Sequence, residues 1–305
     1  MEIKNRTERV STPLPRREGQ GGGSLTIVKV GGAVVEDEAQ LSRLLRDFAA
    51  IPGRKILVHG GGRRATAIAA QLGIETQMVG GRRITDSQML EVVTMVYGGL
   101  VNKTIVARLQ ALGIDAIGLT GADMNCIRSH RRPPIPLPLG EGQGGASLPL
   151  GEGQSGASGG VLDFGFVGDV DKVESSKIAG FIETGATPIM APLTHDGHGQ
   201  LLNTNADTIA SEVAKAMAAE GYEVTLVYCF EKAGVLRQAD DPNSVIPLIT
   251  PESFRQLVAD GIVSGGMLPK IENALAATQA GVRRVLITHS TDLLGLKGTT
   301  IRVES

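Results

Sequence analysis

The chain reads LTIVKVGG over residues 25–32, an apolar and β-branched run that contains one lysine and closes on two glycines. Such a run is typical of a central strand of a parallel sheet, which is buried on both faces. Ligands of such sheets collect beyond the carboxyl ends of the strands. Lys29 would place a positive charge there, and Gly31 and Gly32 would let backbone N–H groups approach an anion. The alternative is a strand and a tight turn with Lys29 solvated.

The composition is that of a globular protein long enough for one large domain or two lobes. The 305 residues carry a formal net charge of −2, and 42% of them are hydrophobic. Only 3% are aromatic, which together with the charge argues against a nucleic-acid surface. Cys126 and Cys229 lack metal-ligand spacing, so neither a zinc site nor a disulfide framework is expected. Without a signal region or an apolar run of membrane-spanning length, we expect a cytoplasmic protein that binds neither membrane nor nucleic acid.

Three related segments rich in glycine and proline interrupt this pattern. LPLGEGQGGAS at residues 137–147 is followed directly by LPLGEGQSGAS at residues 148–158, and LPRREGQGGGS at residues 14–24 is a degenerate relative. These segments have little to bury, so they are predicted to be disordered. We therefore predict a disordered low-complexity segment at residues 1–24 and a disordered insertion at residues 133–160.

A second strand, at residues 55–59, also ends in glycines, Gly60-Gly61-Gly62, and a helix is predicted to follow. Strand, glycines and helix in that order form a cradle for a phosphate group. The remaining chain alternates between strands and helices, which predicts an α/β fold with a mostly parallel sheet. Strands are expected at residues 115–119, 187–191, 224–229 and 284–288, a hairpin at 161–173, and helices at 36–49, 63–72, 87–112, 175–184, 208–219, 251–259 and 271–280.

Polar residues near two helix starts complete the candidate chemistry. Asn203, Asn205 and Asp207 alternate, so an extended chain would direct all three to one side. Alternatively, Asp207 only caps the following helix. Lys270 lies near a helix N-terminus, where the macrodipole disfavours a cation, which indicates an anionic ligand. Phosphoryl transfer needs such positive charge around the migrating group, and lysines with glycine N–H groups supply it without covalent catalysis.

Five motifs, KVGGAVVED, VHGGGRRA, GGRRITD, NTNADT and GGMLPKIENAL, resemble in this order the N-acetylglutamate kinases of the amino-acid kinase family. The resemblance covers nearly all of residues 25–303 except the repeats. It implies an open three-layer αβα sandwich with a mostly parallel central sheet. It further implies an N-terminal lobe at residues 25–220 for acylglutamate binding and homodimerisation, and a C-terminal lobe at residues 221–305 for ATP. The implied reaction is ATP-dependent phosphorylation of the side-chain carboxylate of an N-acyl-L-glutamate, acetyl or succinyl, in arginine biosynthesis.

The matching positions also imply the site residues. The catalytic candidates are Lys29 and Lys270, which would stabilise the phosphoryl group, and Asp207, which would orient both lysines. The substrate-binding candidates are Gly61, Gly62, Arg83 and Asn203. The nucleotide-binding candidates are Gly31, Gly32, Glu231, Gly234, Met267 and Lys270, with Mg²⁺ carried by ATP and no protein side chain assigned to a metal. Glu231 stands where relatives usually carry aspartate, and the preceding Tyr228-Cys229-Phe230 is unlike most of them.

One further departure concerns the acyl group. Arg82 stands where most relatives have leucine, so we also count it as substrate-binding: Arg82 or Arg128 would read the extra carboxylate of N-succinylglutamate. Lys103, Arg63 and Arg64 are expected to be solvated or in ion pairs, and His59 to pack at the end of its strand. The alternative functions are a sibling kinase acting on another carboxylate or a carbamate, and a catalytically weak regulatory protein, although the latter should lack the lysines or Asp207.

Overall fold

The computed structural model describes residues 22–136, 161–238, 240–265, 267–294 and 298–303. An eight-stranded sheet runs through it, with β1 (Ser24–Val30) at the centre and β2 (Arg54–His59) and β13 (Glu223–Phe230) parallel to it on either side. The predicted disorder of residues 1–21 and 137–160 lies outside the described residues. Residues 22–24, also predicted to be disordered, are ordered, because Gly22 donates a hydrogen bond to Gly221 and Ser24 begins β1.

The order of the strands confirms the mostly parallel sheet. It is β14-β16-β15-β13-β1-β2-β10-β5, and within it only β15 and β16 pair in antiparallel fashion. The outer strands are β5 (Ala116–Leu119), β10 (Thr187–Met190), β14 (Leu248–Ile249), β15 (Arg284–His289) and β16 (Thr299–Ile301). The predicted division after residue 220 separates the strands on the β13 side from those on the β1 side. The separate functions of the two lobes remain a prediction.

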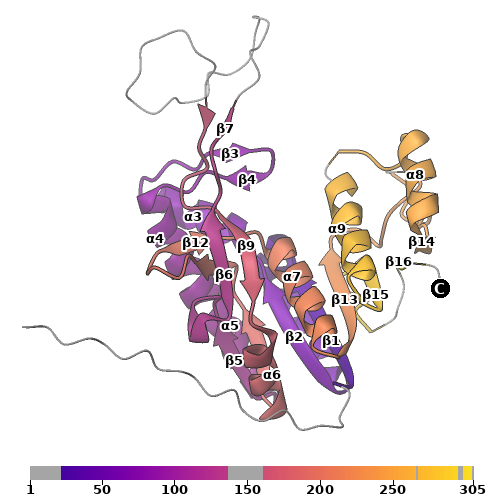
Figure 1. Cartoon of the computed structure of the whole chain (residues 1–305), viewed down its shortest axis with the longest axis horizontal. Coiled ribbons are helices and arrows are strands. Elements are labelled where there is room, and N and C mark those ends of the chain that lie inside the picture. Colours follow the sequence, from indigo (N-terminus) through magenta and orange to yellow (C-terminus); the bar gives the residue numbers. More distant parts are fainter. Residues whose placement is uncertain (1–21, 137–160, 239, 266, 295–297, 304–305) are drawn as a thin grey trace, which may run out of the picture.

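Helices cover both faces of the sheet, so the three-layer αβα sandwich is confirmed (Figure 1). Neighbouring residues of β1 serve opposite layers, because Ile27 belongs to one core and Val28 to the other. The Val28 side packs against α1 (Gly32–Glu36), α2 (Glu38–Ala50), α3 (Gly62–Gln71), α4 (Ser87–Val93), η1 (Thr94–Val101) and α5 (Asn102–Ala111). The Ile27 side packs against α6 (Ser175–Glu183), α7 (Ala206–Ala219), α8 (Pro251–Ala259) and α9 (Met267–Gln279).

A second, four-stranded sheet and two short hairpins lie beside the main sheet. The sheet has the order β12 (Leu201–Asn203), β11 (Leu193–His195), β6 (Ile127–Arg131) and β9 (Gly168–Val173), and the short helix η2 (Asp123–Asn125) precedes β6. The hairpins are β3 (Met78–Val79) with β4 (Arg82–Arg83), and β7 (Ile135–Pro136) with β8 (Val161–Leu162).

The predicted hairpin at residues 161–173 is therefore wrong. Its two halves pair elsewhere, β8 with β7 and β9 with β6, because alternating hydrophobicity identifies a strand but not its partner. The predicted disorder of residues 133–136 is also wrong in part, since Ile135 and Pro136 form β7.

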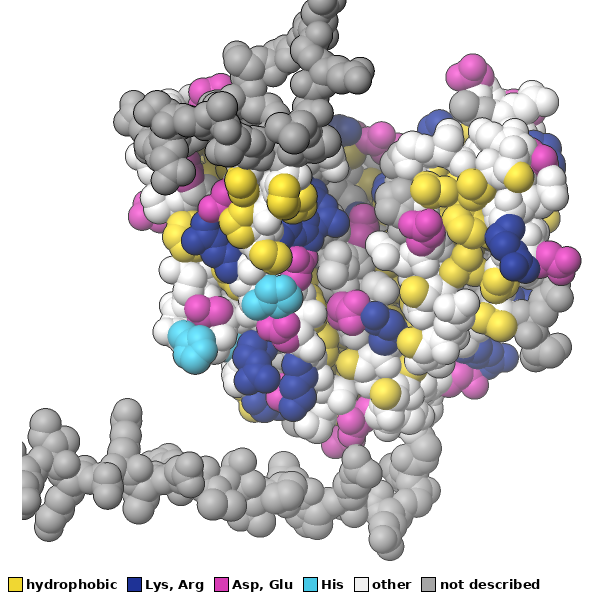
Figure 2. Space-filling model, turned by 45° about the horizontal axis from the view of Figure 1, so that its top comes forward, with side chains coloured by type: hydrophobic (Ala, Val, Ile, Leu, Met, Phe, Trp, Pro, Cys, Tyr) yellow, Lys and Arg dark blue, Asp and Glu magenta, His cyan; other side chains and the backbone are white. Residues whose placement is uncertain are grey.

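The helix predicted at residues 87–112 is continuous over Ser87–Ala111 but changes its winding within η1, which is a π-helix. The change covers Tyr97-Gly98-Gly99, where the paired glycines weaken the α-helix. By length and composition this helix could span a membrane, but half of its most apolar window is buried inside the fold, as expected of a core helix. On the face drawn in Figure 2, basic and acidic side chains are interspersed.

Candidate active site

Two glycine turns pack against each other at the carboxyl ends of β1 and β2. The strands end side by side, with Val30 opposite His59, and Gly60 N donates a hydrogen bond of 2.9 Å to Val30 O. A Cβ atom on Gly60 would lie 2.9 Å from Gly32 N, closer than real Cβ contacts allow. A side chain at Gly60 would therefore push the two turns apart, which explains why a glycine follows β2.

Three helix N-termini contribute residues to one cavity of about 200 Å³: α1 through Gly32, α3 through Gly62 and α7 through Ala206. Free N–H groups and the positive ends of helix dipoles favour an anion at such a place. Most of the substrate-binding candidates line the same cavity. Its lining also includes Gly60, Gly61, Met78, Arg82, Arg83, Tyr97, Arg132, Asp169 and Asn203.

The side chains of Lys29 and Asp207 form an ion pair, in which Lys29 Nζ lies 2.6 Å from Asp207 Oδ1. Lys29 is 7% exposed, because the alternation of β1 turns it toward the layer that contains α7. Removing either partner would leave a buried charge uncompensated. The pair therefore fixes a lysine ammonium group at the end of β1.

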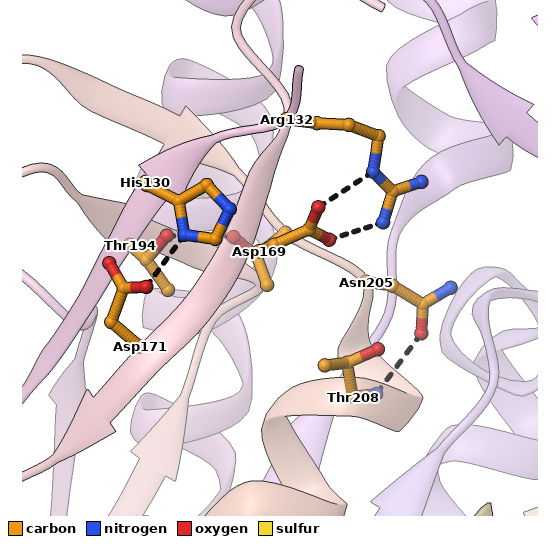
Figure 3. A network of polar contacts seen from close by, with 8 residues as sticks. His130, Arg132, Asp169, Asp171, Thr194, Asn205 and Thr208 are labelled. Atoms are coloured by element: carbon orange, nitrogen blue, oxygen red, sulfur yellow. Dashed lines mark hydrogen bonds and ion pairs between the residues drawn. The ribbon is translucent and has the colours of Figure 1, made fainter. Parts of the chain in front are cut away.

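The capping of α7 leaves the Asp207 carboxylate available for this pair. Asn205 is the N-cap, and its Oδ1 accepts a hydrogen bond of 2.7 Å from Asp207 N. The same oxygen accepts one of 3.2 Å from Thr208 N (Figure 3). The expectation that residues 203–207 are extended is wrong, because Asn203 ends β12 and Asp207 already lies in the first turn of the helix. The alternative that Asp207 caps the helix is wrong as well.

Lys270 approaches the ion pair from α9, on the β13 side of the sheet. It lies in the first turn of α9, which begins at Met267, and its Nζ is 3.9 Å from the centroid of the Phe230 ring. Lys29 Nζ lies 5.0 Å from the same centroid. Burial lowers the pKa of Lys270, nearby Asp207 opposes this change, and the charge of Lys29 reinforces it. The structure thus brings the three catalytic candidates together around one aromatic ring.

Arg83 forms one wall of the cavity and is held there by the protein itself. It is 7% exposed, and its Nη2 donates hydrogen bonds of 2.8 Å to both Gly62 O and Thr66 Oγ1. Its Nη1 contacts Thr76 Oγ1 at 3.2 Å and Met89 Sδ at 3.8 Å. A substrate carboxylate would therefore meet the Nε–H group or replace the two longer contacts.

Of the other substrate-side candidates, Asn203 and Arg82 line the cavity and Arg128 does not. Asn203 Nδ2 donates a hydrogen bond of 2.9 Å to Thr85 Oγ1, which leaves its carbonyl oxygen for a ligand. Arg82 is exposed, and its side chain forms no hydrogen bond or ion pair with the described residues. Arg128 is exposed on β6, opposite Lys172 of β9.

The nucleotide-binding candidates Glu231, Gly234 and Met267 lie beyond β13, outside the lining of this cavity. Glu231 is exposed, and its Oε1 lies 3.4 Å from Arg63 Nη2 at the start of α3, so the expectation of an ion pair for Arg63 is confirmed. A Cβ atom on Gly234 would come within 2.8 Å of Thr299 Oγ1, so close packing requires a glycine. Gly31 directly precedes α1, and Gly32 is its first residue.

His59 has a structural position, as expected. It is fully buried, its Nδ1 lies 2.7 Å from Gly60 O, and its Nε2 lies 3.1 Å from Asn102 Nδ2. Burial lowers the pKa of His59 to about 4, so the ring is neutral at pH 7. With Nδ1–H donating to the carbonyl and Nε2 accepting from the amide, both ring nitrogens support the glycine turn.

Sequence analysis missed two features of the cavity wall. Arg132 forms a two-pronged ion pair with Asp169, with a distance of 2.9 Å between Arg132 Nε and Asp169 Oδ2 (Figure 3), and the guanidinium group lies 5.6 Å from the Phe164 ring. Tyr97 packs against the glycine turn, because a Cβ atom on Gly61 would lie 3.1 Å from Tyr97 Cδ1. Tyr97 lies in the π-helical segment η1, and π-helical turns are frequent at functional sites. The glycines of Tyr97-Gly98-Gly99, which weaken an α-helix, were therefore the feature of the sequence that could have indicated this part of the cavity wall.

The fold and the gathered lysines define a class of phosphoryl-transfer proteins, and comparison with known proteins specifies it. Residues 24–289 match the Amino acid kinase family, and the chain belongs to this family. It is 57% identical over 278 residues to the acetylglutamate kinase of Phocaeicola vulgatus, covering 91% of this chain and 98% of the relative. The acetylglutamate kinase of Bacteroides fragilis is 55% identical, with 91% and 97% covered. The solved structure of smu.665 from Streptococcus mutans is 25% identical, with 91% and 98% covered and a TM-score of 0.66.

Proposed function

We propose that this chain transfers the γ-phosphoryl group of ATP to the side-chain carboxylate of N-acetyl-L-glutamate in the arginine biosynthesis of the cytoplasm. The proposal is supported by the relatives, which are named acetylglutamate kinases and match along nearly their whole length. The observation that carries it is the Lys29–Asp207 ion pair of 2.6 Å with Lys270 beside it. This arrangement also argues against a regulatory protein that has lost its catalytic groups.

The proposed reaction needs electrostatic stabilisation and no proton transfer. A carboxylate oxygen of the substrate forms a bond to the γ-phosphorus, and the bond from this phosphorus to the bridging oxygen breaks, which releases ADP. The glutamate carboxylate is ionised at neutral pH, so it needs no general base. Lys29 would neutralise the charge of the moving phosphoryl group, Lys270 that of the leaving oxygen, and Asp207 would hold Lys29 in place.

On the substrate side, we assign Gly61 and Gly62 to the acylglutamate and Arg83 and Asn203 to its α-carboxylate. The cavity of about 200 Å³ that these residues line supports this assignment. The arginine is fixed by its hydrogen bonds to Gly62 O and Thr66 Oγ1, so little side-chain freedom is lost on binding.

On the nucleotide side, we assign Gly31, Gly32, Glu231, Gly234, Met267 and Lys270 to ATP. The described residues contain no group of three or more His, Cys, Asp or Glu side chains suited to a metal ion. We propose that Mg²⁺ arrives with the ATP phosphates, where it would add positive charge to the phosphoryl group.

We also propose that the chain forms a homodimer through the exposed side of η1. Met95 and Leu100 are 55% and 45% exposed on this helix, and Gly99 between them leaves room for the backbone of another helix. Covering these two side chains in a dimer would remove their apolar surface from water. Sedimentation velocity of the full chain would give the mass of a dimer, and the mass of a monomer would contradict the proposal.

A coupled assay of ADP release, with hydroxylamine to trap the acyl phosphate, tests the main proposal. We expect ADP and trapped product in equal amounts with N-acetyl-L-glutamate, and little product with carbamate or aspartate. ADP release without trapped product, or a preference for carbamate or aspartate, would contradict the proposal and favour a sibling kinase.

A second candidate substrate is N-succinyl-L-glutamate, with Arg82 as the residue that binds its extra carboxylate. Arg82 lines the cavity, and its side chain makes no hydrogen bond or ion pair within the described part of the chain, so its charge is available to a ligand. An arginine that binds a carboxylate contributes about 1.5–3 kcal/mol.

The expected result of Arg82→Ala is therefore a loss of about 10- to 100-fold in kcat/KM for the succinyl substrate, with little change for the acetyl one. Arg128→Ala is the matched control, since Arg128 is exposed and does not line the cavity. Equal effects of Arg82→Ala on both substrates, or a strong acetyl preference that the variant leaves unchanged, would reject this role.

A further inference from the structure

Two aromatic side chains lie side by side at the end of β13. Tyr228 and Phe230 are two residues apart on a strand, so they point to the same face. Their rings are nearly parallel, with an interplanar angle of 9° and centroids 5.9 Å apart. Tyr228 is buried, and its hydroxyl group donates a hydrogen bond of 3.3 Å to the backbone carbonyl of Asp207. The pair thus connects β13 to the helix that carries the candidate catalytic aspartate.

The Phe230 ring contacts both lysines of the proposed site. Its centroid lies 3.9 Å from Lys270 Nζ and 5.0 Å from Lys29 Nζ, both within the range of cation–π interactions. The negative face of an aromatic ring attracts an ammonium group, and the attraction grows where water is excluded. The backbone of Phe230 is also fixed, because its carbonyl accepts a hydrogen bond of 3.1 Å from Ser290 N.

The two lysines differ in what else neutralises them. Lys29 has the Asp207 carboxylate at 2.6 Å, whereas Lys270 forms no ion pair with any residue that the structure describes. Lys270 is half-buried and is repelled by Lys29, while the charges of Asp207 and Glu231 attract it without forming an ion pair. The Phe230 ring, 3.9 Å from the Lys270 ammonium, is in direct contact with it and holds this charge near Asp207.

We propose that Phe230 is a positioning residue, which holds Lys270 beside Lys29 and Asp207 so that both ammonium groups face the transferred phosphoryl group. This inference rests on the proposed kinase function. The roles of the two aromatic residues differ. Tyr228 packs beside the Phe230 ring and nearly parallel to it, and Phe230 makes the contacts with the lysines.

Steady-state kinetics of Phe230→Leu and Phe230→Tyr test the proposal, because leucine keeps an apolar side chain without a ring and tyrosine keeps the ring. We expect Phe230→Leu to lower kcat by about tenfold while KM for ATP changes less than about threefold. Phe230→Tyr should stay within about twofold of the wild type. Phe254→Leu is the matched control, since Phe254 packs on the same core from α8 without a lysine contact, and it should also stay within this range.

Unchanged kcat in Phe230→Leu would overturn the proposal. So would an equal loss of kcat in Phe230→Tyr or in Phe254→Leu, because either result would show a requirement for shape or stability rather than for the ring face. All of these kcat values are compared with that of the wild type, for which formation of the trapped acyl phosphate is shown first.

A spectroscopic measurement decides the question independently of activity. In protein with ¹³C-labelled lysine, the ε-CH₂ signal of Lys270, assigned by its disappearance in Lys270→Arg, should be shifted upfield by the ring and return to the ordinary position in Phe230→Leu. An ordinary position in the wild type would overturn the proposal. If the wild type makes no acyl phosphate but shows the upfield shift, the kinase function fails and the contact between Phe230 and Lys270 stands.

Discussion

The two sides of the cleft are built differently. On the substrate side, Arg83 and His59 are buried and held by hydrogen bonds to the glycine turn and its neighbours. On the nucleotide side, Glu231 is exposed with a single ion pair of 3.4 Å, and Lys270 is held by a ring. We infer from this difference that the proposed acylglutamate side is formed before any ligand binds, and we propose that the nucleotide side gains its polar contacts from the nucleotide.

Lys29 lies between the two sides, so its removal should have the largest effect on activity. We expect Lys29→Ala to lower kcat by about 10²- to 10³-fold and to change both KM values much less, because its charge is needed most in the transition state. Initial-rate kinetics in both substrates measure this.

Lys103→Ala is the control for Lys29→Ala, since Lys103 is exposed and bonds only to Gly118 O at 3.1 Å among the described residues. It should keep full activity. A large rise of KM in Lys29→Ala with kcat unchanged would mean that Lys29 binds the substrate in the ground state. Lys29 would then belong to the binding wall of that substrate and not between the two sides.

The preformed substrate side should be sensitive to acid through His59. Its pKa is about 4 in the folded state and about 6.5 in the unfolded state, so the unfolded chain takes up a proton first as the pH falls. The contribution of neutral His59 to the free energy of unfolding should therefore be fully present above pH 6.5. It should decrease between pH 6.5 and 4, by about 2 kcal/mol at pH 5. Urea denaturation gives the free energy of unfolding of the wild type and of His59→Gln at pH 7.5 and pH 5. The wild type should lose more of this free energy between the two pH values, and the difference between the two proteins is the contribution of His59.

The control for His59 is His198→Gln, because His198 is exposed in the turn after β11 and should leave the pH dependence as in the wild type. If His59→Gln lost stability toward pH 5 as steeply as the wild type, then the acid sensitivity would come from other groups.

The smallest effect is expected on the open nucleotide side. Arg63 and Glu231 are 66% and 62% exposed, and exposed ion pairs contribute about 0–1 kcal/mol. Arg63→Ala should therefore change KM for ATP by less than about fivefold and leave thermal stability nearly unchanged. A double-mutant cycle with Glu231→Gln measures the coupling, and a coupling well above 1 kcal/mol would show that the nucleotide side is also preformed.

Local patterns in the sequence were sufficient for six of the eight strands of the main sheet and for the position of Lys29 at the end of β1, but the short strands β14 and β16 were not predicted. The strand of residues 25–30 follows from hydrophobic spacing, and the glycines mark where two backbones meet. The helix predicted at residues 271–280 begins earlier than expected, at Met267, so that it includes Lys270. The family motifs then grouped Lys29, Asp207 and Lys270, which no spacing in the chain could bring together.

Features that depend on partners distant in the sequence could not be predicted in this way. Arg132 and Asp169 lie 37 residues apart across the second sheet, and their ion pair exists only because β6 pairs with β9. Alternation of polar residues suggested an extended chain up to Asp207, but the Asn205 cap starts a helix there, since a cap depends on three-dimensional backbone geometry.

The π-helical winding of η1 has a consequence for the cavity wall. An α-helix turns by about 100° per residue, and a π-helical turn accommodates one residue more. Shortening Thr94–Val101 by a single residue would therefore restore α-helical winding without rotating α4 relative to α5. Tyr97 lies within the shortened turn, so its contact with Gly61 depends on the number of residues in that turn as well as on their identity.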